Sequence, residues 1–220
     1  MPRRLLRRRP SLCSALNYGE AAFHLLGRIR QGAPWRSASR AVFRGMGSFG
    51  NGAAMRVAPL GAFFADDLDE CVEQAGLSAE ITHAHPEGIA GAISVAIAAA
   101  LAWRQRDAPL APAAFLEAVR DRTPKGEVRG GIEEALSLDH DRVVDAASAL
   151  GNGSGVTAPD TVPFCLWIAS RHPGRYEDAL FGTVAVLGDR DTTCAIVGGI
   201  LASGGAEIPA AWLAAREPLA

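Results

Sequence analysis

The longest apolar stretch of the chain decides the fold, and it is Ile89-Ala90-Gly91-Ala92-Ile93-Ser94-Val95-Ala96-Ile97-Ala98-Ala99-Ala100-Leu101-Ala102-Trp103. A helix that spans a bilayer needs about 20 mainly apolar residues, and this stretch is shorter. It is also rich in alanine, glycine and serine. We therefore predict a helix in the core of the protein and expect no membrane partner.

The composition outside this stretch also favours helices. The chain has 220 residues, which suits one domain with a substantial core, and 49% of them are hydrophobic. Alanine dominates, whereas alternating runs of valine, isoleucine and threonine are scarce. We predict an all-α protein, a compact single-domain helical bundle with short connections. The longer predicted helices are 15–29, 37–43, 68–84, 87–106, 112–121, 131–138, 142–150, 160–170, 176–187 and 192–203.

The four cysteines are scattered along the chain and never form a C-x-x-C pair. This spacing gives neither an obvious zinc site nor a disulfide framework. Buried thiols in a reducing compartment fit the pattern best, so we expect a cytoplasmic protein. Trp167, Phe181 and Trp212 are expected to pack in the core.

The charge is unevenly distributed. Residues 1–44 contain ten arginines and one acid, Glu20, which leaves the other 176 residues at about −11. We divide the chain into a basic, disordered leader (1–14) and a helical domain (15–218). The arginine run resembles an organellar transit peptide, and an unstructured tail or a gene-start artefact is the alternative we favour. The run lacks interleaved aromatic residues and no recognised module follows it, so no nucleic-acid partner is expected.

Two carboxylates and a hydroxyl crowd together in Gly188-Asp189-Arg190-Asp191-Thr192-Thr193, a tight turn that leads into an apolar helix. They can converge on one cation if the backbone bends, and Gly188 permits such a bend. Ligand sets made only of oxygen favour magnesium, manganese or calcium over zinc. The alternative is that Asp191 or Thr192 merely caps the helix.

A second turn, Gly45-Met46-Gly47-Ser48-Phe49-Gly50-Asn51-Gly52, is dense in glycine. Exposed backbone amides beside a helix N-terminus suit an anion such as a phosphate. The turn matches neither a P-loop nor a Rossmann turn. Phe49 suits stacking on a base or ribose, and the alternative is that its ring is tucked into the core.

The turn Thr82-His83-Ala84-His85-Pro86-Glu87 holds two histidines and a carboxylate. His83 and His85 lie two residues apart and would diverge by about 200° on a helix, so they cannot chelate zinc together there. Two alternatives follow, that one histidine faces a ligand pocket or that the histidines have a purely structural role. The acidic segments at 66–69 and at Asp160-Thr161 are expected to start helices, with Pro163 in the first turn of the second.

Taken together and in this order, the segment 47–61, the Thr82–His85 turn and the segment 188–193 resemble the ADP-ribosylglycohydrolases related to dinitrogenase-reductase-activating glycohydrolase. The likeness spans roughly Tyr18 to Pro218, and its motifs are much more specific jointly than singly. The resemblance implies an all-helical fold whose central cleft holds two Mg²⁺ or Mn²⁺ ions. It also implies hydrolysis of the glycosidic bond between ADP-ribose and a protein or small acceptor.

By motif position, the resemblance implies roles for individual residues. Asp189, Asp191 and Thr192 would be metal ligands. The ADP-ribose pocket would be lined by the side chains or amides of Ser48, Phe49, Gly50 and Asn51, with His83 approaching a phosphate or the distal ribose.

The chain departs from the family pattern at its start. Family members usually carry a glycine-rich first helix and a Thr-Asp-Asp turn that supplies the other metal ligands, and this chain has neither. We accordingly expect an N-terminally truncated bundle, a weaker metal site that holds one ion rather than two, and some uncovered apolar surface. Two hypotheses follow: a metal-dependent ADP-ribosyl hydrolase, and a truncated member that binds ADP-ribose without hydrolysing it.

Overall fold

The computed structural model describes residues 20–138 and 142–217. Within these ranges the chain is helical, and its only bridge of β type joins Gly50 to Thr157, so the all-α prediction is confirmed. The predicted leader 1–14 lies outside the described residues, as do 15–19 of the predicted domain. The helices are α2 (Glu20–Arg30), α3 (Trp35–Arg40), α4 (Val42–Gly45), α5 (Gly52–Met55), α6 (Ala58–Phe63), α7 (Leu68–Glu80), α8 (Pro86–Arg104), α9 (Pro112–Arg122), α10 (Glu127–Ser137), α11 (Val143–Leu150), α12 (Ala158–Arg171), α13 (Tyr176–Ala185), α14 (Arg190–Ser203) and α15 (Ala210–Ala215).

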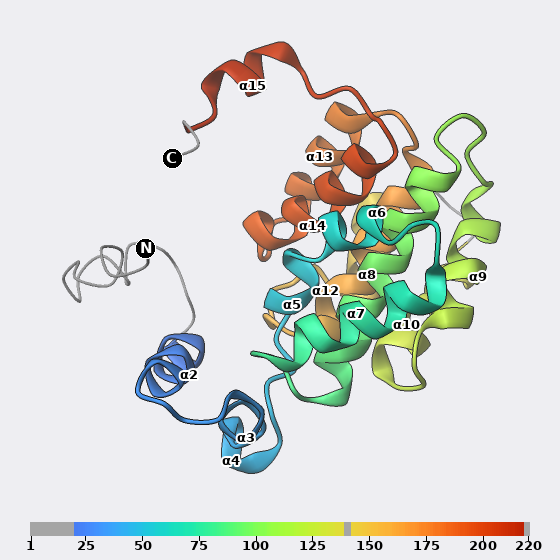
Figure 1. Ribbon diagram of the computed structural model, residues 1–220. Coiled ribbons are helices and arrows are strands. Elements are labelled where there is room, and N and C mark those ends of the chain that lie inside the picture. The colour runs from blue at the N-terminus through green and yellow to red at the C-terminus, as the bar shows by residue number, and fades with distance from the viewer. Residues whose placement is uncertain (1–19, 139–141, 218–220) are drawn as a thin grey trace.

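Helix α8 runs through the middle of the bundle (Figure 1). Every residue from Ala90 to Leu101 is buried. The helix is long and apolar enough to cross a membrane by length and composition, but 72% of its most apolar window is buried inside the protein. The prediction of a core helix is therefore confirmed. The helices that pack against it are α5, α6, α7, α9, α10, α12 and α14.

Glycines let two of these helices approach α8 closely. A Cβ atom added at Gly61 of α6 would lie 2.1 Å from the carbonyl oxygen of Ala96. One added at Gly91 of α8 would lie 2.7 Å from the Cβ of Ala158, the first residue of α12. Because real Cβ atoms do not approach so closely, glycine is required at both positions. The second contact holds the N-terminus of α12 against the first turns of α8.

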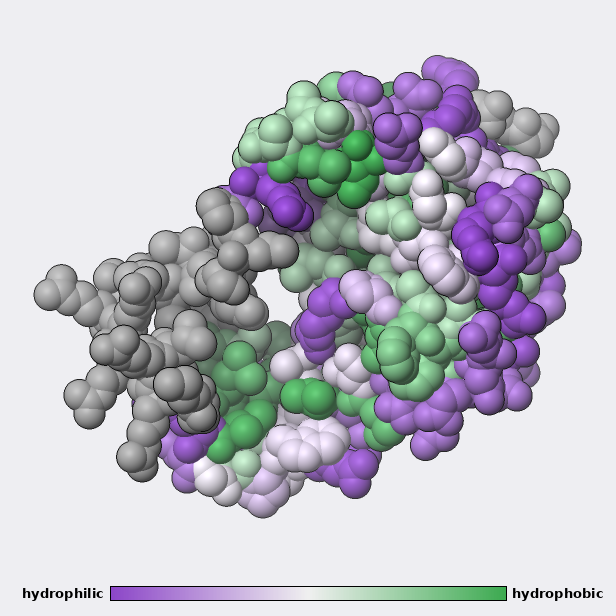
Figure 2. Space-filling view, turned by 45° about the horizontal axis from the view of Figure 1, so that its top comes forward, coloured by the Kyte–Doolittle hydropathy of each residue, from purple (hydrophilic) through white to green (hydrophobic). Residues whose placement is uncertain are grey.

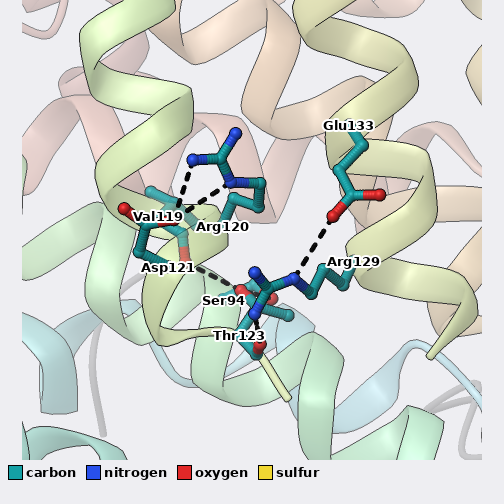
Figure 3. Close-up of polar contacts among 7 residues, drawn as sticks. All are labelled: Ser94, Val119, Arg120, Asp121, Thr123, Arg129 and Glu133. Carbon is teal, nitrogen blue, oxygen red and sulfur yellow. Dashed lines mark hydrogen bonds and ion pairs between the residues drawn. The ribbon is translucent and has the colours of Figure 1, made fainter. Parts of the chain in front are cut away.

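Hydroxyl groups join α8 to α9 inside the core (Figure 3). The Ser94 hydroxyl lies 3.0 Å from that of Thr123, and each also lies within hydrogen-bonding distance of a carbonyl one turn earlier in the chain. The Arg129 side chain, from α10, donates to the Thr123 carbonyl and pairs with Glu133. These bonds satisfy polar groups that would otherwise be costly to bury.

Glu87, in the first turn of α8, caps a different helix. Its two carboxylate oxygens accept hydrogen bonds from the backbone amides of Glu127 (2.8 Å) and Val128 (2.9 Å), the first residues of α10. The residue that precedes α10 is Gly126, which has no side chain with which to cap the helix. The carboxylate therefore neutralises free N–H groups at this end of α10 and fixes α10 against α8.

Helices α2 to α4 lie to one side of the bundle, and α15 extends from it at another point (Figure 1). Arg36 and Arg40 of α3 pair with Glu80 of α7 at 3.9 and 3.5 Å, contacts that contribute little at an exposed site. Several large hydrophobic side chains remain exposed, and Figure 2 shows hydrophobic patches interspersed with hydrophilic ones. Those on α2 to α4 and just after α4 are Phe23, Leu26, Phe43 and Met46.

Three described cysteines carry free thiols. Burial raises the pKa of Cys71 to about 11, and burial likewise raises the pKa of Cys165 and, to a smaller extent, that of Cys194. These thiols are therefore protonated near neutral pH. The prediction of buried thiols holds for Cys71 and Cys165, whereas Cys194 is only partly buried. Cys13 lies outside the described residues.

Some local predictions were wrong. Helix α12 begins at Ala158 with Thr157 as its cap, so Pro163 lies inside the helix rather than in its first turn. Helix α10 begins four residues before the predicted start, where Glu87 caps it. Phe181 is exposed and contacts the partly buried Trp212 edge-on, whereas Trp167 is buried as predicted.

Candidate functional site

Three loops meet where α5, α12 and α14 begin. The turn before α5 joins the loop before α12 through two hydrogen bonds, from Ala158 N to Phe49 O (2.9 Å) and from Asn51 N to Val156 O (3.2 Å). The loop before α12 joins the turn before α14 through a hydrogen bond from Asp189 N to Asn152 O (3.3 Å). The two motifs singled out in the sequence are thus brought together by a third loop, 151–157.

Asp189 occupies the N-cap position of α14, yet its carboxylate does not cap the helix. Its backbone carbonyl accepts hydrogen bonds from the amide and the hydroxyl of Thr193, both at 2.9 Å. The carboxylate instead accepts a hydrogen bond from Asn51 Nδ2 at 2.7 Å. The alternative that Asp191 or Thr192 merely caps this helix is therefore wrong.

Gly188 supplies the predicted bend. Its φ is +69°, and an added Cβ would lie 2.2 Å from the carbonyl oxygen of Asn152. On the other side of the contact, a Cβ added at Gly153 would lie 2.9 Å from the Cβ of Asp189. Loop 151–155 is thus packed closely against the turn 188–193, called the acidic turn below, and Gly153 is buried.

Asp191 and Thr192 have different surroundings. Asp191 is exposed, and its carboxylate makes no hydrogen bond or ion pair with another described residue. Thr192 is only 5% exposed, and its hydroxyl has Met55 Sδ, a weak acceptor, as its partner at 3.5 Å. A buried hydroxyl oxygen with so weak a partner keeps its lone pairs available.

The donor types at this turn are those that a hard divalent cation prefers. Among the described residues no group of three or more His, Cys, Asp or Glu side chains gathers at one place. The segment 189–192 offers a cation two carboxylates and one hydroxyl, all oxygen donors. Mg²⁺ in proteins is commonly held by one or two carboxylates and keeps several waters, so these residues suit Mg²⁺ or Mn²⁺ better than a metal that needs a complete protein cage.

Asn51 is buried, with 3% of its surface exposed. Besides its bond to Asp189, Nδ2 donates to Thr161 Oγ1 at 3.0 Å. Thr161 in turn donates to the carbonyl of Thr157 at 2.7 Å. Sequence reasoning interpreted Thr161 only as part of a helix start, because no local pattern signals a contact with a residue 110 positions away.

The glycine-dense turn is partly closed by its own hydrogen bonds. Gly50 N donates to Ser48 Oγ (3.2 Å), whereas the amides of Ser48 and Phe49 make no hydrogen bond with another described residue. Phe49 is 38% exposed, and its ring centroid lies 5.1 Å from that of His85. The alternative in which Phe49 is tucked into the core is therefore wrong.

His83 lies against the same turn, because Cβ atoms added at Gly50 and Gly52 would lie 3.3 and 3.1 Å from its ring. Its Nδ1 lies 2.7 Å from Thr82 Oγ1, which accepts a hydrogen bond from Arg56. Burial lowers the pKa of His83 to about 4, and the positive charge of Arg56 adds to the shift. The imidazole is therefore neutral at neutral pH.

The other histidine of this turn has a structural role. His85 is the N-cap of α8, and its Nδ1 accepts a hydrogen bond from Glu87 N at 3.1 Å. Helix α7 ends at Glu80, earlier than predicted, so both histidines lie in a turn between α7 and α8. Each Nδ1 has a protein partner within this turn.

Known proteins resemble this chain over most of its length. A sequence model of the ADP-ribosylglycohydrolase family matches residues 3–218. An uncharacterized protein of Archaeoglobus fulgidus is 30% identical over 198 residues, which cover 89% of this chain and 60% of that protein. ADP-ribosylhydrolase ARH3 of Mus musculus is 29% identical over 209 residues, 79% of this chain and 54% of that protein.

ADP-ribosylhydrolase ARH3 of Homo sapiens is 28% identical over 207 residues, 79% of this chain and 55% of that protein. The chain thus spans little more than half the length of these two hydrolases. The family match covers nearly all of the chain, including the acidic turn and the glycine-dense turn. The chain therefore belongs to the ADP-ribosylglycohydrolase family.

Proposed function

We propose that this chain is a metal-dependent hydrolase that cleaves the glycosidic bond between ADP-ribose and a protein or small acceptor. Family membership supports the class of reaction. The single observation that carries the proposal is the Asp189 carboxylate, which leaves its own helix uncapped and points to Asn51 of the glycine-dense turn. An acidic side chain held beside that turn suits a site where a cation and a phosphorylated ligand meet.

In this proposal Asp189, Asp191 and Thr192 hold one Mg²⁺ or Mn²⁺. A bound cation of this kind supplies Lewis-acid polarisation of an oxygen and makes water a better nucleophile near neutral pH. The exposed Asp191 carboxylate has no protein partner to displace among the described residues. The buried Thr192 hydroxyl has only a thioether partner.

The ADP-ribose moiety is assigned to the turn from Ser48 to Asn51 and to His83. Phe49 offers a ring face for the adenine or a ribose, and the free amides of Ser48 and Phe49 can donate to phosphate oxygens. The neutral His83 can donate one hydrogen bond from Nε2 if Thr82 donates to Nδ1. The backbone amides of Gly50 and Asn51 already donate to Ser48 Oγ and Val156 O, so they shape the turn rather than bind an anion.

The carboxylates also suit the reaction itself. Glycosidic cleavage passes through an oxocarbenium-like transition state, and nearby negative charge stabilises the positive charge that develops on the sugar. Asp189 and Asp191 lie at the N-terminal end of α14, where their two negative charges would offset those of a bound dication, so that no net positive charge opposes the forming oxocarbenium ion.

Release of ADP-ribose from mono-ADP-ribosylated protein, with excess Mn²⁺ or Mg²⁺, tests the proposal. We expect turnover by the wild-type chain and a loss of at least about 100-fold in Asp191→Ala. The matched control is Asp107→Ala, an exposed carboxylate after the far end of α8, which should leave the rate unchanged. Absence of turnover on arginine-linked, serine-linked and small-acceptor conjugates, or an Asp191→Ala rate equal to that of the wild type, would count against the hydrolase.

The second candidate function is ADP-ribose binding without hydrolysis. It is favoured by the small ligand set, because two carboxylates and one hydroxyl are all that the described residues offer a cation at this turn. Calorimetry with ADP-ribose separates the two functions. Binding that Mn²⁺ does not strengthen, together with no release of ADP-ribose, identifies the binding protein.

A further inference from the structure

We propose that Thr161 and Asn51 form a positioning relay that fixes the Asp189 carboxylate for the cation, and that neither residue contacts ADP-ribose through its side-chain N–H or O–H groups. The inference rests on the proposed function and deepens it. It assigns Asn51 a different role from that of a ligand-binding residue, and it brings into the site a residue of α12 that no motif indicated.

The orientation of the Asn51 amide follows from its neighbours. The Thr161 hydroxyl already donates its single hydrogen to Thr157 O, so towards Asn51 it can only accept. An ionised carboxylate also only accepts, and Asp189 Oδ2 lies 2.7 Å from the amide. Both neighbours require a donor, so the NH₂ group and not Oδ1 must face them.

This arrangement uses both hydrogens of Nδ2. One bonds to Thr161 and the other to Asp189, which leaves the amide no N–H group for a substrate. Asn51 is also held through its backbone, because its N–H donates to Val156 O and its carbonyl accepts from Met55 N. Because hydrogen bonds hold both its side-chain amide and its backbone, Asn51 cannot turn towards a ligand without breaking buried hydrogen bonds.

The relay determines which carboxylate oxygen is available. Oδ2 of Asp189 is engaged by Asn51, whereas no hydrogen bond to Oδ1 is formed by a described residue. A metal-binding carboxylate is oriented by such partners, and their removal typically costs about 10–100-fold in metal affinity. Thr161 is fully buried in α12, and the Asn51 amide bridges it to Asp189. Thr161 therefore fixes the orientation of the amide, and the amide fixes that of the Asp189 carboxylate.

The test is the affinity of the metal-free, full-length chain for Mn²⁺ alone, measured by calorimetry or by electron paramagnetic resonance of free Mn²⁺. Thr161→Val keeps the shape of the side chain and removes the hydroxyl, and we expect a dissociation constant about 10-fold higher. Thr161→Ser restores the hydroxyl and should return the constant to within about 2-fold of the wild-type value.

Thr183→Val is the matched control. Thr183 is also a fully buried threonine whose hydroxyl donates to the carbonyl one turn earlier, Ala179 O at 2.7 Å, but it lies on α13 and has no partner at the acidic turn. It should leave Mn²⁺ affinity unchanged. If Thr161→Val does not fold, Asn51→Ala provides the same test, with an expected rise of about 10–100-fold.

Wild-type Mn²⁺ affinity in folded Thr161→Val or Asn51→Ala overturns the relay, as does a loss that Thr161→Ser fails to rescue. Asp191→Ala separates this failure from that of the proposed function. If Asp191→Ala loses Mn²⁺ while Thr161→Val retains it, the metal site stands and the relay alone is wrong. If the wild-type chain binds no Mn²⁺, both are wrong.

Discussion

Asn51 Nδ2 donates a hydrogen bond of 2.7 Å to Asp189 Oδ2, joining residues 138 positions apart. Asn51 lies near the end of the glycine-dense turn, and Asp189 lies near the start of the acidic turn. The contact is buried on the Asn51 side and partly exposed on the Asp189 side. It therefore joins the cation-binding candidate at Asp189 to the phosphate-binding candidate in the glycine-dense turn.

Phe49→Ala should weaken ADP-ribose binding by about 1–3 kcal/mol, the usual effect of removing a ring on which a base stacks. Thermal stability should change little, because the ring is already 38% exposed. Calorimetry with ADP-ribose measures the effect. The control is Phe63→Ala, since Phe63 is 80% exposed on α6, and equal losses in both variants would argue against a specific contact.

Lowering the pH should destabilise the chain through His83. Burial and Arg56 lower the pKa of His83 from 6.5 to about 4 in the folded state, so the unfolded chain binds a proton more readily. The stabilising contribution is therefore complete above about pH 6.5 and is lost as the pH falls towards 4. The loss is on the order of 3 kcal/mol.

Urea unfolding of the wild type and of His83→Gln at several pH values tests this expectation. Carboxylates titrate in the same range, so the informative quantity is the difference between the two proteins. The free energy of unfolding of the wild type should fall relative to that of His83→Gln as the pH falls from 6.5 to 4. A difference that stays constant with pH would show that His83 titrates normally.

Gly188→Ala should destabilise the chain more than Gly205→Ala. Both glycines have positive φ, +69° and +78°, so both substitutions add about 1–2 kcal/mol of backbone strain. At Gly188 the new Cβ also meets Asn152 O at 2.2 Å, whereas at Gly205 nothing lies within 4 Å. The overlap should add about 1–3 kcal/mol in chemical denaturation, and equal effects at the two sites would contradict the close packing of loop 151–155.

Glu87→Ala should cost about 1–2 kcal/mol of stability, because it removes the cap that α10 lacks from its own sequence. Glu87→Gln should recover part of the loss, since one amide oxygen can still accept. Glu134→Ala, an exposed position on α10, serves as the control. Chemical denaturation measures all three, and a Glu87→Ala chain as stable as the control would exclude the capping role.

The sequence predicted the general architecture because its signals are local. A long run of small apolar residues requires burial wherever it lies, and helix α8 shows this. The capping role of Asp67 was likewise predictable, since its carboxylate accepts from the amides of Asp69 and Glu70 just after it. The predicted helix start was wrong where the capping residue comes from a distant segment, as at α10, whose cap Glu87 lies 40 positions away.

The candidate site divides in the same way. The residue types at positions 48–51 and 189–192 already indicated an anion site and a cation site, since glycine-rich amides and clustered carboxylates have those preferences in any fold. Which residue serves which partner was decided by the tertiary structure. Asn51 lies in the glycine-dense turn but directs its amide to Asp189, and Thr161, placed by the packing of α12 on α8, holds it there. Such contacts between distant segments depend on how helices approach one another, and no periodicity or spacing within one segment carries that information.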